Sequence, residues 1–189
     1  KEMDKRAEAA IEKMGVHIDA DMRISDMPVG HKQFTEIARE LSKDQLKLLI
    51  LDEPTAVLTE KEAEALLDSI RNMSAQGIAI IFITHNLGVV AEICDKVCVM
   101  YAGHMVEKAD VRDLFYHPAH PYTLGLLRSM PRVDADSYER LIPIAGTPVD
   151  MLDLPAGCPF APRCEKCMRV CCRTMPPETT VGERHTASC

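Results

Sequence analysis

The stretch that most constrains the fold is the apolar run at residues 48–51, which Asp52 and Glu53 follow directly. Four consecutive apolar residues are typical of a strand buried on both faces, as in a parallel sheet. The two carboxylates then fall at the strand's carboxyl end, where open α/β sheets place their ligands. A carboxylate at the end of a buried strand destabilises the fold unless a partner neutralises its charge, and a magnesium ion bound to phosphates is such a partner. Glu53 would then stand beside that ion, where it can polarise an attacking water molecule.

A second apolar strand is predicted at residues 78–83, with His85 just beyond its carboxyl end. Between the two strands, apolar residues recur at helical spacing behind a capping box formed by Thr59 and Glu62. A strand, a crossover helix and a strand make a right-handed parallel unit, so we expect His85 to lie beside the two carboxylates. A lone histidine after a strand is more often structural, but this spacing favours a role at the same site.

A turn and a helix precede the first strand. The helix shows one apolar face, made by Phe34, Ile37, Ala38 and Leu41. The turn contains a glycine, and free backbone N–H groups at such a helix start can bind an anion. The alternative is a plain turn before a surface helix, because many helices begin after glycine. The position just ahead of the Asp52 strand favours phosphate contacts, and the candidate residues are Pro28, Val29, Gly30 and His31.

The composition fits an aliphatic α/β domain with a small appendage. Of the 189 residues, 47% are hydrophobic and only 4% are aromatic. The net charge of −7 argues against a broad nucleic-acid surface. Because no apolar run reaches membrane-spanning length and no signal peptide is visible, we expect a cytoplasmic chain that docks on another chain for any membrane process.

The chain contains no G-x-x-x-x-G-K-[ST] phosphate loop. Its first residue is Lys1, and apolar residues recur at helical spacing from there to Met14. We therefore expect a fragment that starts within a domain and that does not hydrolyse ATP by itself.

Six of the eight cysteines lie after residue 157. In a reducing compartment, clustered cysteines suggest a metal or cluster site more than disulfides. The other two, Cys94 and Cys98, are expected to be buried core thiols. Residues 131–155 are rich in proline and weakly periodic, so they predict an extended linker. We accordingly expect one domain at residues 1–130 and a cysteine-rich extension at residues 131–189.

The motifs of residues 24–85 resemble those of ABC-transporter ATPases. Residues 48–54 resemble the Walker B motif, which implies that Asp52 holds magnesium through water and that Glu53 is the catalytic carboxylate. His85 resembles the switch histidine that contacts the γ-phosphate. Thr59 stands where the family's D-loop has an aspartate. The resemblance implies a P-loop NTPase-type parallel sheet with flanking helices, with ATP and Mg²⁺ as ligands.

Residues 27–31 resemble the ABC signature motif L-S-G-G-Q in its L-S-V-G-Q variant. Pro28 replaces the serine whose hydroxyl reaches the γ-phosphate, and His31 replaces the glutamine. Since proline has neither a hydroxyl nor an N–H, one phosphate contact is lost. Gly30 is the firm match.

The two parts of the chain resemble different importer ATPases. Residues 86–127 and 144–148 resemble the dipeptide and oligopeptide importers, whereas the signature and Walker B regions look more like the monosaccharide importers. The seam lies near residues 77–86. The resemblance implies an ATPase subunit that energises peptide uptake, with a sugar importer as the alternative.

The cysteine-rich segment resembles the C-terminal extension of the peptide-importer ATPases. The matching residues are Cys158, Cys164, Cys171 and Cys189. Some members of that family carry a four-iron cluster at these positions, and four thiolates suit either a [4Fe-4S] cluster or zinc. Free thiols remain a third alternative, and Cys167 and Cys172 could substitute as ligands.

Two other classes of function compete with the ATPase. One is a metal-binding module without a motor role, which does not need Gly30, Asp52-Glu53 and His85 in this order. The other is a non-transport ABC protein acting on DNA or ribosomes, against which the acidic balance weighs. The resemblance implies transmembrane permease subunits, a second ATPase subunit in a homo- or heterodimer, and a solute-binding protein as partners. It implies no nucleic acid, and a peripheral location on the cytoplasmic side of the cell membrane.

Overall fold

A computed structural model of the chain describes residues 11, 14, 16, 18–19, 21–41, 46–130 and 141–189. The chain divides into two compact units, Lys1–His85 and Asn86–Cys189, called unit 1 and unit 2 below. The helical pattern predicted before Met14 lies largely outside the described residues, as does the 131–140 part of the predicted linker. The domain division expected after residue 130 falls inside unit 2 and stays a prediction.

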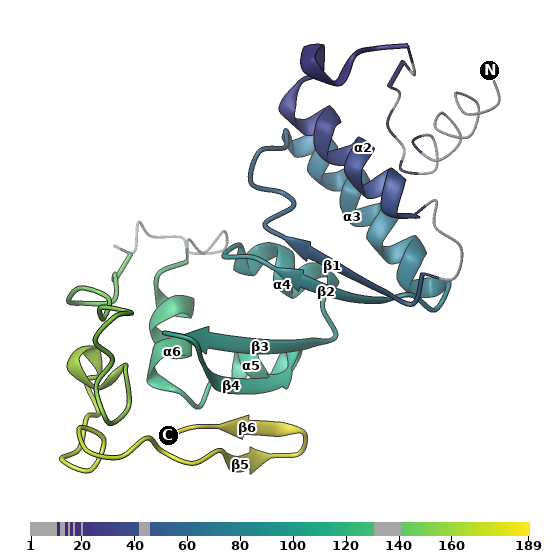
Figure 1. Cartoon of the computed structure of the whole chain (residues 1–189). Helices are drawn as coiled ribbons and strands as arrows, with labels where there is room; N and C mark the ends of the chain where they lie inside the picture. The colour runs from purple at the N-terminus through teal and green to yellow at the C-terminus, as the bar shows by residue number, and fades with distance from the viewer. Residues whose placement is uncertain are drawn as a thin grey trace. The chain divides into compact units, whose positions relative to one another are not determined.

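Unit 1 is an α/β unit built on a two-stranded parallel sheet (Figure 1). Its elements are η1 (Ile24–Asp26), α2 (Val29–Leu41), β1 (Leu48–Asp52), α3 (Glu60–Ala75) and β2 (Ala79–Ile83). The strands pair in parallel, from Leu48 opposite Ala79 to Asp52 opposite Ile83. Since α3 connects them, the strand, helix and strand predicted from the sequence are confirmed.

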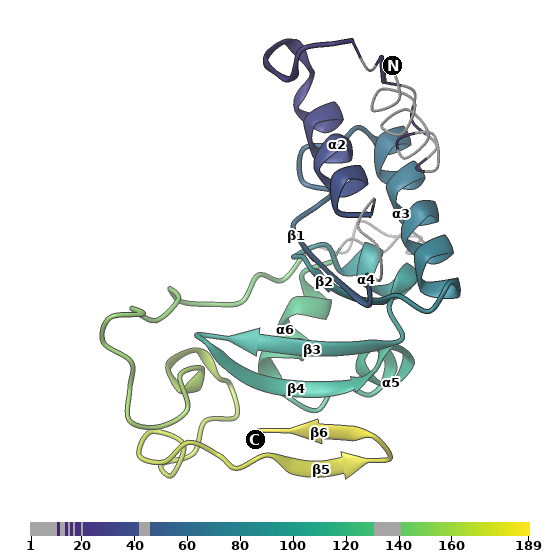
Figure 2. The same ribbon diagram turned by 45° about the vertical axis from the view of Figure 1, so that its right-hand side comes forward.

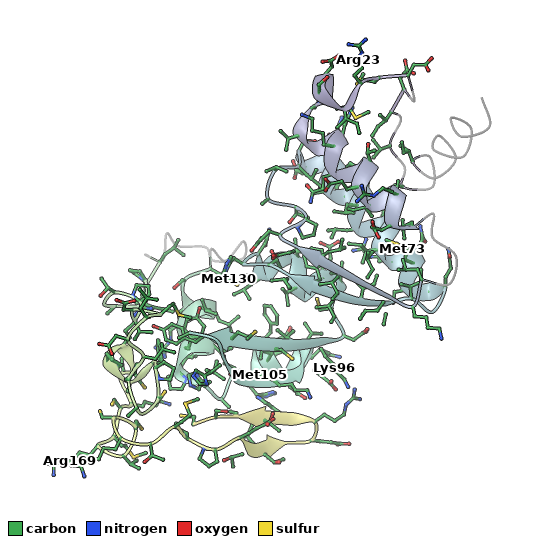
Figure 3. The ribbon with its side chains drawn as sticks, viewed as in Figure 1. Arg23, Met73, Lys96, Met105, Met130 and Arg169 are labelled. Atoms are coloured by element: carbon green, nitrogen blue, oxygen red, sulfur yellow. The ribbon has the colours of Figure 1, made fainter. Side chains whose placement is uncertain are left out.

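The helices α2 and α3 of unit 1 lie side by side (Figure 1), and each buries most of the apolar stripe that its sequence predicts. At the start of α3, Thr59 Oγ1 accepts a hydrogen bond from Glu62 N, and Glu62 Oε2 accepts one from Thr59 N at 2.9 Å. This capping box satisfies backbone donors that would otherwise be unpaired. The buried stripes are Leu66, Leu67, Ile70 and Met73 on α3 (Figure 3) and Phe34, Ile37 and Ala38 on α2. No helix in the described part of the chain has the length and apolarity needed to cross a membrane.

The prediction that both strands are buried on both faces is wrong for the chain as described. Side chains alternate between the faces of a strand, and only one face of β1, with Leu49 and Leu51, is buried. The other face, called the open face below, carries four exposed apolar side chains: Leu48 at 47%, Ile50 at 58%, Ile81 at 47% and Ile83 at 48%. Among the described elements of unit 1, the helices cover one face alone.

Unit 2 contains a four-stranded antiparallel sheet in the order β3-β4-β6-β5 (Figure 2). The strands are β3 (Lys96–Tyr101), β4 (His104–Asp110), β5 (Thr179–Gly182) and β6 (His185–Ala187), and the helices are α4 (Leu87–Ile93), α5 (Val111–Tyr116), α6 (Pro121–Arg128) and η2 (Ala161–Arg163). A two-residue turn joins β3 to β4 through Ala102 and Gly103, which have φ of 47° and 78°. Positive φ at both positions is the geometry that matches the twist of a hairpin. The later strand β6 lies between β4 and β5.

The cysteine-bearing segment shares the core of unit 2. Cys158, Phe160 and Ala161 are buried with residues of β3, β4 and α5. The Phe160 ring meets Tyr101 edge-on, with ring centroids 5.2 Å apart, and lies 5.4 Å from the Tyr122 ring. Aromatic rings in these arrangements add to the stabilisation that burial supplies. The segment is thereby anchored to the hairpin of β3 and β4.

Candidate functional site

The carboxylate of Glu53 lies just beyond the carboxyl end of β1, and residues following β2 hold it. Thr84 Oγ1 donates to Glu53 Oε2 at 3.2 Å, and the backbone N–H of His85 donates to Oε1 at 3.0 Å. The backbone N–H of Glu53 donates to Ile83 O at 2.8 Å. The φ of Glu53 is 45°, in the left-handed region that non-glycine residues seldom occupy. Such strain persists where the surrounding contacts determine the conformation, and it is concentrated at functional sites.

The imidazole of His85 stands beside the same carboxylate. Its Nε2 lies 3.6 Å from Glu53 Oε1, and the side chain is fully exposed. Asp52 ends β1 opposite Ile83, and its side chain is exposed at the same edge. The expected meeting of Asp52, Glu53 and His85 at one edge of a parallel sheet is confirmed, whereas their roles stay predictions. The contribution of Thr84 was missed by the sequence analysis, although a hydroxyl directly after a strand is a signal for it.

Pro28, just before α2, and Val29, the first residue of α2, are both exposed. Pro28 O accepts the hydrogen bond of Lys32 N at 3.1 Å, so Pro28 occupies the N-cap position of the helix. Gly30 is buried where α2 meets α3, and a Cβ on it would lie 2.9 Å from Glu62 Oε1. The predicted phosphate-contacting segment is therefore open at its first two residues and packed at the third.

Glu62 connects this segment to the start of α3. Its Oε1 lies 3.8 Å from His31 Nε2, while its Oε2 accepts from both the backbone N–H and the hydroxyl of Thr59. The two hydrogen bonds from Thr59, followed by the nearby His31, hold the pKa of Glu62 below its usual value. The sequence predicted the helix cap but not the approach to His31. Pro28 and His31 thus accept hydrogen bonds from Lys32 and Thr35 of α2, and His31 also approaches Glu62. The hydrogen bonds of Glu53 run to β2 and the residues after it.

The predicted cysteine ligands meet through a close approach of two chain segments. Cys158 N donates to Cys171 O at 2.7 Å. Beside it, a Cβ on Gly157 would lie 2.1 Å from Cys171 O, so only glycine allows this approach. Burial, followed by the neighbouring thiols of Cys164 and Cys171, raises the pKa of Cys158.

The fourth cysteine is brought to this place by β6. That strand pairs with β4, and the next residue, Ser188, donates its backbone N–H to Val106 O at 2.9 Å. Burial raises the pKa of Cys189, and the thiols of Cys164, Cys158 and Cys171 raise it further. Cys158 and Cys171 therefore lie side by side, and the pairing of β6 with β4 carries Cys189 toward the core of the same unit. Even so, over the described ranges no three or more His, Cys, Asp or Glu side chains are arranged to hold a metal ion.

All eight cysteines are free thiols. Cys94 is half-buried and Cys98 is exposed, so the expectation of a core position is wrong for Cys98. The reason is strand alternation, since the neighbours Val97 and Val99 occupy the inward positions of β3.

A buried carboxylate that the sequence analysis missed connects three elements of unit 2. Glu107 on β4 is 1% exposed. Its Oε1 accepts from Ala119 N at 2.7 Å and lies 2.7 Å from His185 Nε2 on β6, and its Oε2 accepts from His120 N at 2.9 Å. The sequence of β4 gives no clear signal for it, because Glu107 stands between Val106 and Lys108 in a strand of mixed polarity. Charged residues are rarely buried without partners, and Glu107 has three. Glu107 fixes the start of α6 and the position of β6, and through β6 that of Cys189.

Residues 106–171 match a family described as the oligopeptide/dipeptide transporter C-terminal region. The match begins in β4 and ends at Cys171, so it contains Glu107 and three of the predicted cysteine ligands.

Named relatives are ATP-binding proteins of peptide transport. The chain is 46% identical over 143 residues to the dipeptide transport ATP-binding protein DppD of Bacillus subtilis, which covers 75% of this chain and 42% of DppD. It is 48% identical over 133 residues to the oligopeptide transport ATP-binding protein OppD of Salmonella typhimurium, and the match covers 70% of this chain and 39% of OppD. A peptide import ATP-binding protein of Brucella abortus is 41% identical over 195 residues, and the match covers 96% of this chain and 57% of that protein. The chain spans about half the length of the curated relatives it matches. The Brucella abortus match covers nearly the whole chain and carries a peptide-import name, so it gives no support to a sugar importer as the alternative.

Solved structures agree on the fold. CbiO1 of Clostridium perfringens, part of the ABC transporter complex cbiONQ, matches with a TM-score of 0.52 and 31% identity over 61% of this chain and 46% of that chain. The ATP-binding cassette MJ1267 in its ADP conformation matches with a TM-score of 0.54 and 22% identity over 67% and 50%, which supports the fold alone. The chain is therefore similar to ATP-binding proteins of ABC transporters over most of its length, and residues 106–171 match the oligopeptide/dipeptide transporter C-terminal region.

Proposed function

We propose that the chain is part of the ATP-hydrolysing subunit of a peptide-importing ABC transporter. The observation that carries the proposal is the Glu53 carboxylate, held by Thr84 and by the backbone of His85 at the edge of the parallel sheet. Peptides as the transported class are supported by the names of DppD and OppD and by the matched C-terminal region.

In this proposal each residue at the sheet edge has one task. Glu53 takes the proton of the attacking water, because a carboxylate fixed by two donors keeps one orientation. His85, fully exposed beside it, is free to contact the γ-phosphate of bound ATP. Asp52 would hold Mg²⁺ through water, and its exposed carboxylate has the oxygen chemistry that this ion prefers.

The 189 residues contain no phosphate loop, so we propose that turnover requires a phosphate loop from outside them. Residues 28–31 and Thr59 would face the nucleotide of a second ATPase subunit. The remaining partners are transmembrane permease subunits and a solute-binding protein, at the cytoplasmic side of the membrane. The net charge of −7 gives no support to a nucleic-acid partner.

An uptake experiment tests this function. The chromosomal gene is replaced by one that encodes Glu53→Gln, and uptake of labelled dipeptides, oligopeptides and a monosaccharide is measured. We expect loss of peptide uptake with unchanged monosaccharide uptake. The exposed Glu64 on α3 provides the matched control, Glu64→Gln, which should transport normally. Loss of monosaccharide uptake alone would overturn the peptide assignment.

We propose in addition that Cys158, Cys164, Cys171 and Cys189 hold one metal centre, either a [4Fe-4S] cluster or zinc. The hydrogen bond from Cys158 N to Cys171 O at 2.7 Å and the pairing of β6 with β4 ahead of Cys189 support the proposal. Neighbouring thiolates repel one another, and a bound cation removes that repulsion. Because the four side chains, all within the described part of the chain, are not arranged to hold a metal ion, binding requires that they move.

Metal analysis after purification without oxygen tests this second proposal. A cluster gives a brown protein with iron and sulfide in equal amounts, and zinc gives a colourless protein with one metal per chain. Serine at any of the four positions should lower the metal content, whereas Cys98→Ser, on the exposed face of β3, should not. Metal-free wild-type protein would overturn the proposal.

A further inference from the structure

Two cysteines outside the proposed ligand set lie against each other on the surface of unit 2. The Sγ atoms of Cys167 and Cys172 are 3.8 Å apart, and both residues are exposed. One backbone oxygen, that of Met168, lies 3.6 Å from the first sulfur and 4.0 Å from the second. Both thiols are therefore gathered on the same side of one short segment.

Consecutive tight turns bring the two thiols together. Cys167 N donates to Cys164 O at 3.1 Å, Cys171 N to Met168 O at 3.0 Å, and Arg173 N to Val170 O at 3.0 Å. Arg169 lies in the middle of this segment, and its side chain projects away from the ribbon (Figure 3). No helix or strand includes residues 164–174. Bringing sulfurs from 3.8 Å to the length of a disulfide, about 2.05 Å, therefore requires only a small movement of an exposed turn.

The neighbouring cysteines are less available for reaction. Cys158 is buried, and Cys164 and Cys171 are half-buried. The backbone of Cys171 is also bound to that of Cys158. Access by a small reagent thus favours Cys167 and Cys172 over these three.

We infer that Cys167 and Cys172 form a reversible redox site that closes to an intramolecular disulfide by exchange with a low-molecular-weight disulfide. One cysteine sulfur attacks the small disulfide, forms a mixed disulfide and releases one small thiol. The second cysteine sulfur then attacks the protein sulfur of that mixed disulfide and releases the second small thiol. Two protein thiols are oxidised, and their two electrons and two protons appear on the two small thiols. The inference does not rest on the proposed transport function.

Oxidised glutathione is the reagent for the test. The chain as purified is equilibrated with mixtures of oxidised and reduced glutathione, free thiols are alkylated, and intact and trypsin-cleaved masses are measured. The product should be lighter by about 2 Da before alkylation, because two hydrogens are lost, and should carry two fewer alkyl groups. Trypsin cleaves after Lys166, Arg169 and Arg173, so the bridge should join the peptides 167–169 and 170–173.

Serine variants identify the bridge. Cys167→Ser and Cys172→Ser should each abolish it, whereas Cys98→Ser and Cys171→Ser should retain it. A trivalent arsenical, which binds paired thiols, should protect two thiols fewer from alkylation in Cys172→Ser than in the wild type. Glutathione adducts without a bridge, or a bridge that persists in Cys172→Ser through Cys171, would overturn the inference.

Discussion

The backbone N–H of His85 donates a hydrogen bond to Glu53 Oε1 at 3.0 Å, across 32 positions of the chain. The imidazole of the same residue lies 3.6 Å from that oxygen. His85 therefore contacts Glu53 in two ways, and only one of them depends on its side chain. A replacement of the histidine removes the imidazole and leaves the main-chain support of the carboxylate in place.

Two variants of a protein that contains the phosphate loop should test the roles of Glu53 and His85 separately. Glu53→Gln should reduce ATP hydrolysis by about 100-fold or more, because a general base is lost, while nucleotide affinity is retained. His85→Ala should also slow hydrolysis, with Glu53 still held by the backbone. Hydrolysis rates and equilibrium nucleotide binding are measured side by side with Glu64→Gln as the control. Loss of binding together with hydrolysis in Glu53→Gln would make Glu53 structural.

Pro28 at the N-cap of α2 gives a prediction about the dimer. In the complete protein, Pro28→Ser should strengthen ATP-dependent association, because a hydroxyl regains a charge-assisted hydrogen bond to phosphate worth about 1.5–3 kcal/mol. Pro28→Ala is the matched control, since it removes the ring without supplying a hydroxyl. Analytical ultracentrifugation with and without ATP compares the two. Equal association of the serine and alanine variants would show that the hydroxyl makes no such contact.

The buried Glu107 predicts a large loss of stability in unit 2. Glu107→Ala leaves His185 and two backbone N–H groups without their acceptor, so we expect a loss of about 3–5 kcal/mol. Amides at 119, 120 and 185–187 should exchange faster, which hydrogen exchange with mass spectrometry can localise. Lys108→Gln, at the neighbouring exposed position of β4, should change stability by about 0.5 kcal/mol or less. A loss below about 1 kcal/mol for Glu107→Ala would contradict the assigned contacts.

His120 predicts how the stability of unit 2 depends on pH. Burial lowers the pKa of His120 from its usual 6.5, and the opposing effect of Glu107 is smaller. Above pH 6.5 the histidine is neutral in both the folded and unfolded states and has no effect. As the pH falls below that value, only the unfolded state takes up the proton, so the free energy of unfolding decreases toward the lowered pKa.

Urea denaturation at several pH values can measure this dependence. His120→Asn removes the titration, and its side-chain oxygen can still cap α6 by accepting from Tyr122 N, as His120 Nδ1 does at 3.1 Å. Its stability should therefore fall less steeply with acidification than that of the wild type. His117→Asn, at an exposed position, should keep the wild-type slope. The same slope in His120→Asn would exclude His120 as the source.

The close approach at Gly157 leads to a prediction about the reactivity of Cys158. Gly157→Ala places a methyl group 2.1 Å from Cys171 O, so the segments of Cys158 and Cys171 must separate. Cys158 should then react faster with a thiol reagent, because it is exposed. The exposed neighbour provides the control, Ala156→Ser. Unchanged reactivity of Cys158 would show that the segment adjusts in another way.

The sequence predicted what depends on local patterns. The apolar runs of β1 and β2 and the capping box at Thr59 are contiguous signals, and the handedness of a strand–helix–strand unit then brings Glu53 and His85 together. The pair of Glu107 and His185 spans 78 positions, and no periodic pattern marks such a distant partner. The open face of β1 and β2 was not predicted for a different reason. A run of consecutive apolar residues has the same sequence whether one face of the strand is covered or both are.

The strand order of unit 2 has a consequence for the timing of its biosynthesis. Because β6 lies between β4 and β5, β5 leaves the ribosome before the strand that connects it to the sheet exists. β5 has no partner strand until His185–Ala187 has emerged, and the pair joins the sheet only when β6 docks on β4. Non-local pairing of this kind is slow to form. Cys189 takes its place only after this docking, so the proposed metal site is completed by the pairing of β6 with β4.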